Sequence, residues 1–506
     1  GWASETTPEV LLADVQAIVD PEEVYSWATR VSVPTLVIHG DDDRVSPLLR
    51  GETLARETGG ELVVLGGAGH IPLARDPVRV NLLIRDFVER LRGGGSRTRR
   101  WTRGRHRPKR ALYISSPIGL GHARRDVAIA DELRRRHPDL EIEWLAQHPV
   151  TRVLEDAGET VHPASHHLAS ESAHIESESG EHDLHCFQAW RRMDEILLAD
   201  FMVFHDVVGG RDYDLVIGDE AWEVDYYVHE NPELKRFAYC WLTDFVGWLP
   251  MPDGGDHEAF LTADYNAEMI QHIDRYPRVR DRALFVGNPT DIVPDRFGPD
   301  LPLIRDWTED HYEFTGYITG FDPSRVADRD AIRHELGYRP DEPICVVTVG
   351  GSGVGSNLLQ RVADAYPSAA ERLPGLRMLI VTGPRIDPET LRRNEGVDVR
   401  AYVPELYRHL GVSDVAVVQG GLTTCMELTA TQRPFIYLPL RRHFEQNFHV
   451  HHRLRRYRAG RRMDFEEADV DALGAAITAE IERRVDYQPV ETDGARKAAD
   501  LIAEML

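Results

Sequence analysis

The sequence predicts an α/β protein with parallel sheets, and two observations support this prediction. Short apolar runs recur along the chain, as expected of strands that are buried on both faces of a parallel sheet; they include residues 111–115, 213–219, 344–349 and 415–418. Several of these runs end at a turn that opens an amphipathic helix. Because ligands of open α/β sheets bind at the carboxyl ends of the strands, we expect functional residues in those turns.

Length and composition limit the class of protein. At 506 residues the chain is long enough for two to four domains, and its net charge of −25 argues against a general affinity for nucleic acid or acidic lipid. The four cysteines are scattered without a Cys-x-x-Cys pair, which suits a reducing compartment and suggests no metal cage. No apolar run approaches the roughly 20 residues of a membrane span, and the first residues do not resemble a signal peptide. We therefore expect a cytoplasmic protein.

Residues 1–92 are predicted to form a segment of their own. Asp43 follows a strand at 33–39, and His70 follows a second strand at 61–65. This pattern resembles the C-terminal end of an α/β-hydrolase, where a strand-end acid and a later histidine complete a triad. No Gly-x-Ser-x-Gly turn precedes it, and a His–Asp pair without a nucleophile cannot run acyl transfer. We expect no esterase activity, whether the segment is part of a longer fusion or an inactive remnant.

A glycine-rich and then strongly basic linker is predicted at residues 93–109. Its composition is typical of a solvated tether between domains, which is the favoured interpretation. An electrostatic contact of this segment with an anionic surface is the alternative, so a peripheral association with the membrane stays open.

Residues 110–325 are predicted to form the next α/β domain, with its first strand followed by a glycine turn and His122. Arg124 takes the place of the third glycine of a dinucleotide fingerprint, which disfavours NAD binding. A histidine with a near-neutral pKa suits a general base, although it could instead cap the helix or contact a phosphate. This glycine turn resembles the first glycine loop of GT-B glycosyltransferases. The resemblance implies that His122 accepts the proton of the acceptor hydroxyl and that Asp219, which ends a later strand, orients it. Glu220 is a second candidate, and a capping role for Asp219 is the alternative.

Two further stretches of this domain carry expectations. Residues 162–185 mix histidines and acids with small polar residues and show no hydrophobic periodicity. We expect a mobile, solvated loop over the cleft there, and a metal site is the less favoured alternative. Aromatic residues gather at 237–248, with Trp222 before them; buried core is the default interpretation, and an apolar ligand pocket is the alternative.

Residues 326–506 are predicted to form the last domain, which contains the most informative stretch, 415–447. Gly420 and Gly421 allow a sharp turn, after which Thr423 and Thr424 open a helix whose free N–H groups can receive a phosphate. Glu427 lies one turn inside that helix, where a carboxylate can accept hydrogen bonds from ribose. A purely structural strand–turn–helix is the alternative.

This stretch resembles the donor-binding segment of GT-B glycosyltransferases that use nucleoside diphosphate sugars. Two branches are close: the UDP-glycosyltransferases of small molecules, and the bacterial N-acetylglucosaminyltransferase that makes lipid II. Gln419 stands where the plant-type motif has a histidine. We therefore expect the contact that this histidine makes with the phosphate to be weaker here or made differently. The resemblance implies donor-site roles for Gly351, Ser352 and Gly353 of a glycine loop, Tyr402 and Val403 beside the base, Gly420, Gly421, Thr423 and Thr424 at the diphosphate, Glu427 at the ribose, and Gln446 and Asn447 at the sugar.

The implied fold is GT-B, in which two Rossmann-like domains face each other across a cleft, here preceded by the partial α/β-hydrolase segment. The implied reaction is inverting, metal-independent transfer of a sugar from a nucleotide donor, with UDP favoured, to a hydroxyl of a small molecule or lipid. The nucleotide sugar is a substrate, so we expect no cofactor. A nucleotide-sugar 2-epimerase and a non-catalytic sugar-nucleotide-binding protein are the alternatives.

Overall fold

A computed structural model describes residues 21–93, 107–351, 353–392 and 394–506 of the chain. The chain divides into two compact units, residues 1–100 and 101–506, and each is described by itself. Every strand pair in the three sheets is parallel, which confirms the predicted α/β class.

The smaller unit contains a two-stranded sheet with a small core. Strand β1 (Leu36–Gly40) pairs with β2 (Glu61–Leu65), and Leu65, Ala68 and Val80 form the buried cluster. Many of its large apolar side chains are exposed; Val45, for example, is 68% exposed. A sheet of two strands is marginal without further packing, so this unit buries little of its apolar surface. Its helices are α2 (Pro21–Ala28), α3 (Leu48–Thr58), α4 (Pro72–Arg75) and α5 (Pro77–Leu91).

The first sheet of the larger unit has the strand order β4-β3-β5-β6-β7-β8. The chain adds β4 on one side of β3 and β5 on the other, so the carboxyl ends of β3 and β5 form a topological switch point, where ligands of such sheets bind. The strands are β3 (Arg110–Ser115), β4 (Glu141–Leu145), β5 (Leu215–Asp219), β6 (Ala238–Thr243), β7 (Arg282–Phe285) and β8 (Glu313–Phe314). The helices are α6 (Leu120–Arg136), α7 (Val150–Asp156), α8 (Glu171–Ser177), α9 (Cys186–Arg191), α10 (Asp194–Gly210), α11 (Trp222–Glu230), α12 (Gly255–Arg275) and α13 (Ile304–His311).

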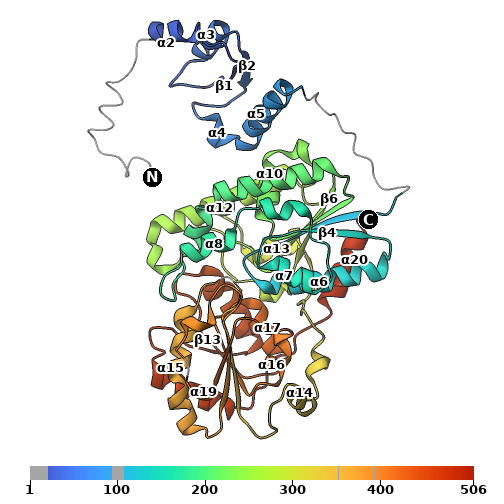
Figure 1. Ribbon diagram of the computed structural model, residues 1–506, viewed down its shortest axis with the longest axis vertical. Coiled ribbons are helices and arrows are strands. Elements are labelled where there is room, and N and C mark those ends of the chain that lie inside the picture. Colours follow the sequence, from blue (N-terminus) through green and yellow to red (C-terminus); the bar gives the residue numbers. More distant parts are fainter. Residues whose placement is uncertain (1–20, 94–106, 352, 393) are drawn as a thin grey trace, which may run out of the picture. The chain divides into compact units, whose positions relative to one another are not determined.

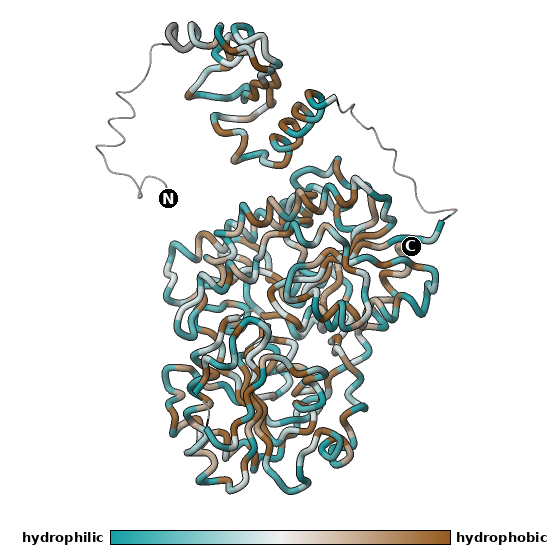
Figure 2. The backbone as a smooth tube through the Cα atoms, viewed as in Figure 1, coloured by the Kyte–Doolittle hydropathy of each residue, from teal (hydrophilic) through white to brown (hydrophobic). Residues whose placement is uncertain are grey.

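The second sheet repeats this arrangement in the order β11-β10-β9-β12-β13-β14, with its switch point between β9 and β12. The strands are β9 (Ile344–Thr348), β10 (Arg377–Val381), β11 (Val397–Arg400), β12 (Val415–Val418), β13 (Phe435–Tyr437) and β14 (Arg461–Arg462). The helices are α14 (Arg329–Glu335), α15 (Ser356–Arg372), α16 (Leu406–Val412), α17 (Leu422–Ala430), α18 (His451–Tyr457), α19 (Val470–Ile481) and α20 (Gly494–Ala503), with a π-helix at Glu445–Val450. The apolar strands of both sheets lie at the centre of their domains (Figure 2).

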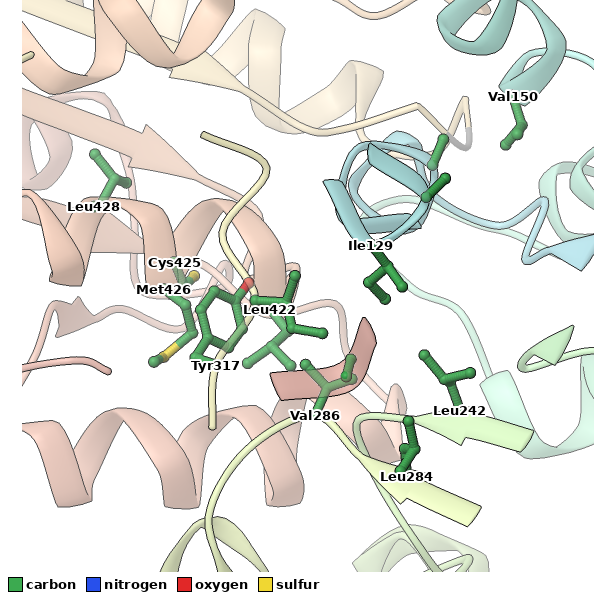
Figure 3. Close-up of a cluster of buried hydrophobic side chains, with 14 of the residues drawn as sticks. Ile129, Val150, Leu242, Leu284, Val286, Tyr317, Leu422, Cys425, Met426 and Leu428 are labelled. Carbon is green, nitrogen blue, oxygen red and sulfur yellow. The ribbon is translucent and has the colours of Figure 1, made fainter. Parts of the chain in front are cut away.

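The two sheet domains of the larger unit share a continuous core. Figure 3 shows Tyr317 beside Leu422 and Met426 of α17, in one cluster with Leu242 and Leu284 of the first sheet. Helix α20, at the end of the chain, packs on α6 of the first domain (Figure 1), where Arg136 Nε donates to Asp500 Oδ1 over 2.5 Å. The end of the chain therefore holds the two domains together at the C-terminal end of α6.

The prediction of a mobile, solvated loop at residues 162–185 is wrong. The segment contains a 3₁₀ turn (Pro163–His167) and α8, and His182 and Asp183 are buried against the second domain. His182 Nε2 lies 3.0 Å from the carbonyl of Leu438, and Asp183 accepts hydrogen bonds from Arg441 Nη2 over 2.6 Å and from Arg442. The polar side chains that suggested a solvated loop make contacts between the domains instead.

The aromatic stretch at 237–248 is largely core, as its default interpretation stated. Phe245 and Trp248 are buried in a cluster with Phe187 and Phe444. Within the described residues, none of the helices has both the length and the apolar character needed to cross a membrane.

Candidate functional site

One cavity is lined by both domains of the larger unit, at the carboxyl ends of β3, β9 and β12. The first domain contributes the turn before α6, and the second contributes the turns after β9 and β12 together with the start of α17. This is the cleft that the two switch points predict. The polar side chains that line it are His122, Arg124, Asp244, Thr348, Tyr402, Gln419, Thr423, Thr424, His443, Glu427, Glu445 and Gln446.

The start of α17 is built to receive an anion. Gly420 has a φ of +108°, which lets the chain leave β12 in a sharp turn, and a Cβ on Gly421 would meet only open space. No side chain caps the helix at Gly421, so the backbone N–H groups of its first turn, including those of Thr423 and Thr424, have no helical partner. These N–H groups and the helix dipole favour a negatively charged group in the cleft.

Glu427 lies on α17, about one turn after its start, and one oxygen of its carboxyl group has no hydrogen-bond partner. Its side chain is buried, and Oε1 has no hydrogen-bond partner. Burial raises the pKa of Glu427 to about 7, against an opposing effect of Arg124. A buried polar atom without a partner is rare in a native protein, and in a cleft it indicates a ligand that supplies the missing hydrogen bond.

The glycine loop after β9 is the second wall of this site. Gly350, Gly353 and Gly355 have positive φ values of 89°, 85° and 126°, and Gly351 lines the cavity. Gln419 Nε2 donates to the carbonyl of Val354 over 3.1 Å, so its amide links the turn after β12 to the glycine loop after β9. Ser352 lies outside the described residues.

The remaining predicted donor residues differ in their positions. Tyr402 and Val403 line the cavity, with the guanidinium of Arg152 stacked 4.5 Å from the centre of the Tyr402 ring. Gln446 also lines it, while its Oε1 accepts a hydrogen bond from the backbone N–H of Leu440 over 2.8 Å.

Asn447 is turned toward its own loop and does not line the cavity. The Nδ2 of Asn447 donates to the carbonyls of Leu440 and His443, over 2.8 and 3.0 Å. Glu445 lines the cavity instead, at the first residue of the π-helix. The sequence analysis gave Glu445 no role, and its position at a π-helix, a form frequent at functional sites, was not readable from the sequence.

His122 and Asp219 are in hydrogen-bond contact on the first-domain side of the cleft. The Nδ1 atom of His122 lies 2.9 Å from Oδ2 of Asp219, which is fully buried at the end of β5. If the Nδ1 proton is donated to Asp219, Nε2 is the nitrogen that can accept a proton; His122 lines the cavity, and 17% of its side chain is exposed. This is the geometry of a histidine base oriented by a carboxylate.

Arg125 is a buried third member of this group that sequence reasoning missed. Its Nε donates to Asp219 Oδ2 over 2.9 Å, and its Nη groups donate to Asp219 Oδ1 and to Asp244. Burial opposes ionisation of Asp219, but Arg125 and His122 lower its pKa by more, so the carboxyl stays charged. The sequence contained one indication of this contact: Arg125 is a charged residue three positions after His122, which places both on the same face of α6.

The charges around His122 set its protonation. Burial and Arg125 lower the pKa of His122, but Asp219 and Glu220 raise it by more, and the result is about 9. Glu220 has a φ of +51°, a strained conformation typical of functional sites, and its Oε2 lies 4.0 Å from His122 Nε2. Burial, together with Asp244, raises the pKa of Glu220 to about 7.

One group of side chains in the described ranges could hold a metal ion: His122, Asp219 and Glu220. One ligand atom from each of them lies within 4.8 Å of the other two. Arg125 argues against a cation there, because its Nη2 lies 2.8 Å from His122 Nδ1 and it donates to both oxygens of Asp219. A metal ion would have to displace a buried guanidinium from its partners.

In the smaller unit, Asp43 and His70 are also in contact. His70 Nδ1 lies 3.0 Å from Asp43 Oδ2, and 48% of the imidazole is exposed. Burial raises the pKa of Asp43, but hydrogen bonds from the Ser46 N–H and from His70 lower it by more, to about 2. The pair fits the predicted end of an α/β-hydrolase, and that assignment stays a prediction.

Residues 344–505 match the model of the glycosyltransferase family 28 C-terminal domain, so the second sheet domain is a domain of that family. An uncharacterized glycosyltransferase of Methanopyrus kandleri is 26% identical over 217 residues, which cover 41% of this chain and 61% of that protein. The UDP-N-acetylglucosamine–N-acetylmuramyl-(pentapeptide) pyrophosphoryl-undecaprenol N-acetylglucosamine transferase of Thermobifida fusca is 33% identical over 121 residues, 23% of this chain and 31% of the relative. The chain thus spans less than two thirds of the length of either relative.

Among solved structures, the glycotransferase of kitacinnamycin aligns with 79% of this chain and 100% of its own, with a TM-score of 0.49 and 16% identity. A MurG from Acinetobacter baumannii aligns with 78% of this chain and 95% of its own, with a TM-score of 0.42 and 14% identity.

Proposed function

We propose that this protein transfers a sugar from a nucleoside diphosphate donor to a hydroxyl group of a small-molecule or lipid acceptor. One observation carries the proposal: a helix start suited to an anion, an unsatisfied glutamate and, from the opposite domain, the histidine of a His–Asp pair line one cleft. The family 28 domain at residues 344–505 supports the same assignment for the donor side.

The donor would bind to the second domain. The first-turn N–H groups at Thr423 and Thr424 receive the diphosphate, and Oε1 of Glu427 accepts hydrogen bonds from the ribose. The base lies near Tyr402, and Glu445 and Gln446 face the sugar. UDP is the nucleotide of first choice, because the Thermobifida fusca relative is named for a UDP-sugar.

The proposed reaction is a single displacement that inverts the anomeric carbon. Nε2 of His122 takes the acceptor proton, and Asp219 stabilises the imidazolium that forms. The acceptor oxygen then bonds to the anomeric carbon as its bond to the diphosphate breaks, and the N-terminus of α17 stabilises the charge on the departing phosphate. This scheme needs no metal, and the buried Arg125 already occupies the candidate metal group.

The test is calorimetric binding of UDP, dTDP, GDP and ADP, followed by assays of transfer with the sugar form of any nucleotide that binds. UDP binding that is lost in Glu427→Ala and retained in His122→Ala would support the donor site. Consumption of the nucleotide sugar without an acceptor would favour the 2-epimerase, and binding without turnover would favour the non-catalytic alternative. A folded protein that binds no nucleotide would overturn the proposal.

A further inference from the structure

Arg124 is a cation that lines the cleft. It lies on α6 of the first domain, two residues after His122, and lines the cavity shared with the second domain. In the described part of the chain, no carboxylate or other hydrogen-bond acceptor contacts its guanidinium. Its neighbour Arg125 is fully paired, and Arg385, which follows Pro384 of the cavity lining, pairs with Glu176 over 2.5 Å. Arg124 is thus available to a ligand.

The backbone around Arg124 brings it to the start of α17. A Cβ on Gly121 would lie 2.2 Å from Oγ1 of Thr423, so the first turn of α6 rests directly against the anion-binding turn. Arg124 itself packs at its Cβ against Gly320, where an added Cβ would lie 2.8 Å away. The close packing at Gly121 and Gly320 fixes the position of the Cβ atom of Arg124.

Arg124 and Glu427 act on each other without forming an ion pair. The charge of Arg124 lowers the pKa of Glu427, yet the two groups, both lining the cavity, are not within the 4.0 Å of a salt bridge. Oε1 of Glu427 has no partner either. A cation and an unsatisfied carboxyl that share a cavity without contact leave room between them for a group that is both anionic and rich in hydroxyls.

We propose that Arg124 binds the diphosphate of the donor from the first domain, opposite the N–H groups of α17. This inference rests on the proposed function and extends it, because it gives the first domain a part in donor binding. A guanidinium forms strong charge-assisted hydrogen bonds with phosphate oxygens. The diphosphate then bridges the domains, and a nucleoside monophosphate, which lacks the outer phosphate, cannot do so equally well.

The experiment compares UDP and UMP binding to the full chain by calorimetry. In Arg124→Gln, the affinity for UDP is expected to fall between about 10-fold and 100-fold, as for a lost hydrogen bond between charged groups, whereas UMP affinity changes less than about 3-fold. Arg124→Lys should bind UDP more tightly than Arg124→Gln, because it keeps the charge. Arg135→Gln is the matched control: it removes an exposed arginine from the same helix and should bind UDP as the wild type does.

Several outcomes would overturn the inference. Unchanged UDP binding by Arg124→Gln would show that the side chain does not contact the diphosphate. An equal loss for UDP and UMP would place Arg124 away from the outer phosphate. If the wild type binds no nucleoside diphosphate, the proposed function fails, and the inference fails with it; wild-type binding that is insensitive to Arg124 rejects the inference alone.

Discussion

The Nδ1 atom of His122 lies 2.9 Å from Oδ2 of Asp219, although 97 residues separate them in the chain. His122 follows β3 and Asp219 ends β5, and these neighbouring parallel strands have Ser115 opposite Asp219 in their register. The switch point of the first sheet therefore produces the contact.

If this pair acts as proposed, Asp219→Asn should lower kcat of sugar transfer strongly. The amide favours the wrong tautomer of His122 and cannot stabilise the imidazolium, so we expect a loss of about 10²–10⁴-fold, with UDP affinity changed less than about 3-fold. Release of UDP in a coupled assay measures kcat. An unchanged kcat would remove the pair from the mechanism.

The rate of transfer should rise with pH. The pKa of His122 is about 9 in the free protein, so at pH 7 only about 1% of the imidazole is in the neutral form that can accept a proton. We expect kcat/KM to increase from pH 7 toward pH 9 and then to level off. A profile that falls over this range would indicate that the protonated histidine is the active form.

Loss of Arg125 should destabilise the larger unit. Arg125→Met leaves the buried carboxylate of Asp244 without its guanidinium partner and that of Asp219 with His122 alone, which costs about 3–5 kcal/mol of the free energy of unfolding. The neighbouring Arg124→Met is the matched control and should cost less than about 0.5 kcal/mol, since no described residue forms an ion pair or hydrogen bond with Arg124. Urea denaturation measures both, and equal effects would contradict the structural role assigned to Arg125.

Two buried carboxyl groups, of Glu171 at the start of α8 and Asp200 on α10, should make the free energy of unfolding fall as pH rises. Burial and the charge of Asp200 raise the pKa of Glu171 to about 8, and burial raises that of Asp200 to about 7. Gln147 Nε2 donates to both, over 3.0 and 2.9 Å. The folded state binds these protons more tightly than the unfolded chain, so their stabilisation is complete below about pH 4 and is lost between there and pH 8.

The measurement is the thermal midpoint between pH 5 and pH 8.5. It should decline with pH in the wild type and decline less in Glu171→Gln, which keeps the shape of the side chain and removes its titration. A midpoint that rises with pH, or an identical slope in the variant, would show that these carboxyl groups do not control stability.

Local features of the sequence predicted the strands and the turns that carry the chemistry. The apolar run at 415–418 became β12, the glycine at 420 took a positive φ, and a helix followed, although α17 begins at Leu422 and neither Thr423 nor Thr424 caps it with a hydroxyl. Each follows from neighbours within a few residues, because buried strands, glycine turns and helix starts have their own sequence patterns.

The sequence could not predict the contacts between distant residues. Arg125 is buried because Asp219 and Asp244, 94 and 119 residues away, neutralise it, and no local pattern encodes such a pairing. For the same reason the polar segment 162–185 looked solvated, while Asp183 pairs with Arg441, 258 residues later. The sequence by itself determined the elements and the chemistry of their turns. The tertiary structure decided which charges are paired and which, like that of Arg124, have no partner among the described residues, because burial makes each charge depend on the partners that the fold brings to it.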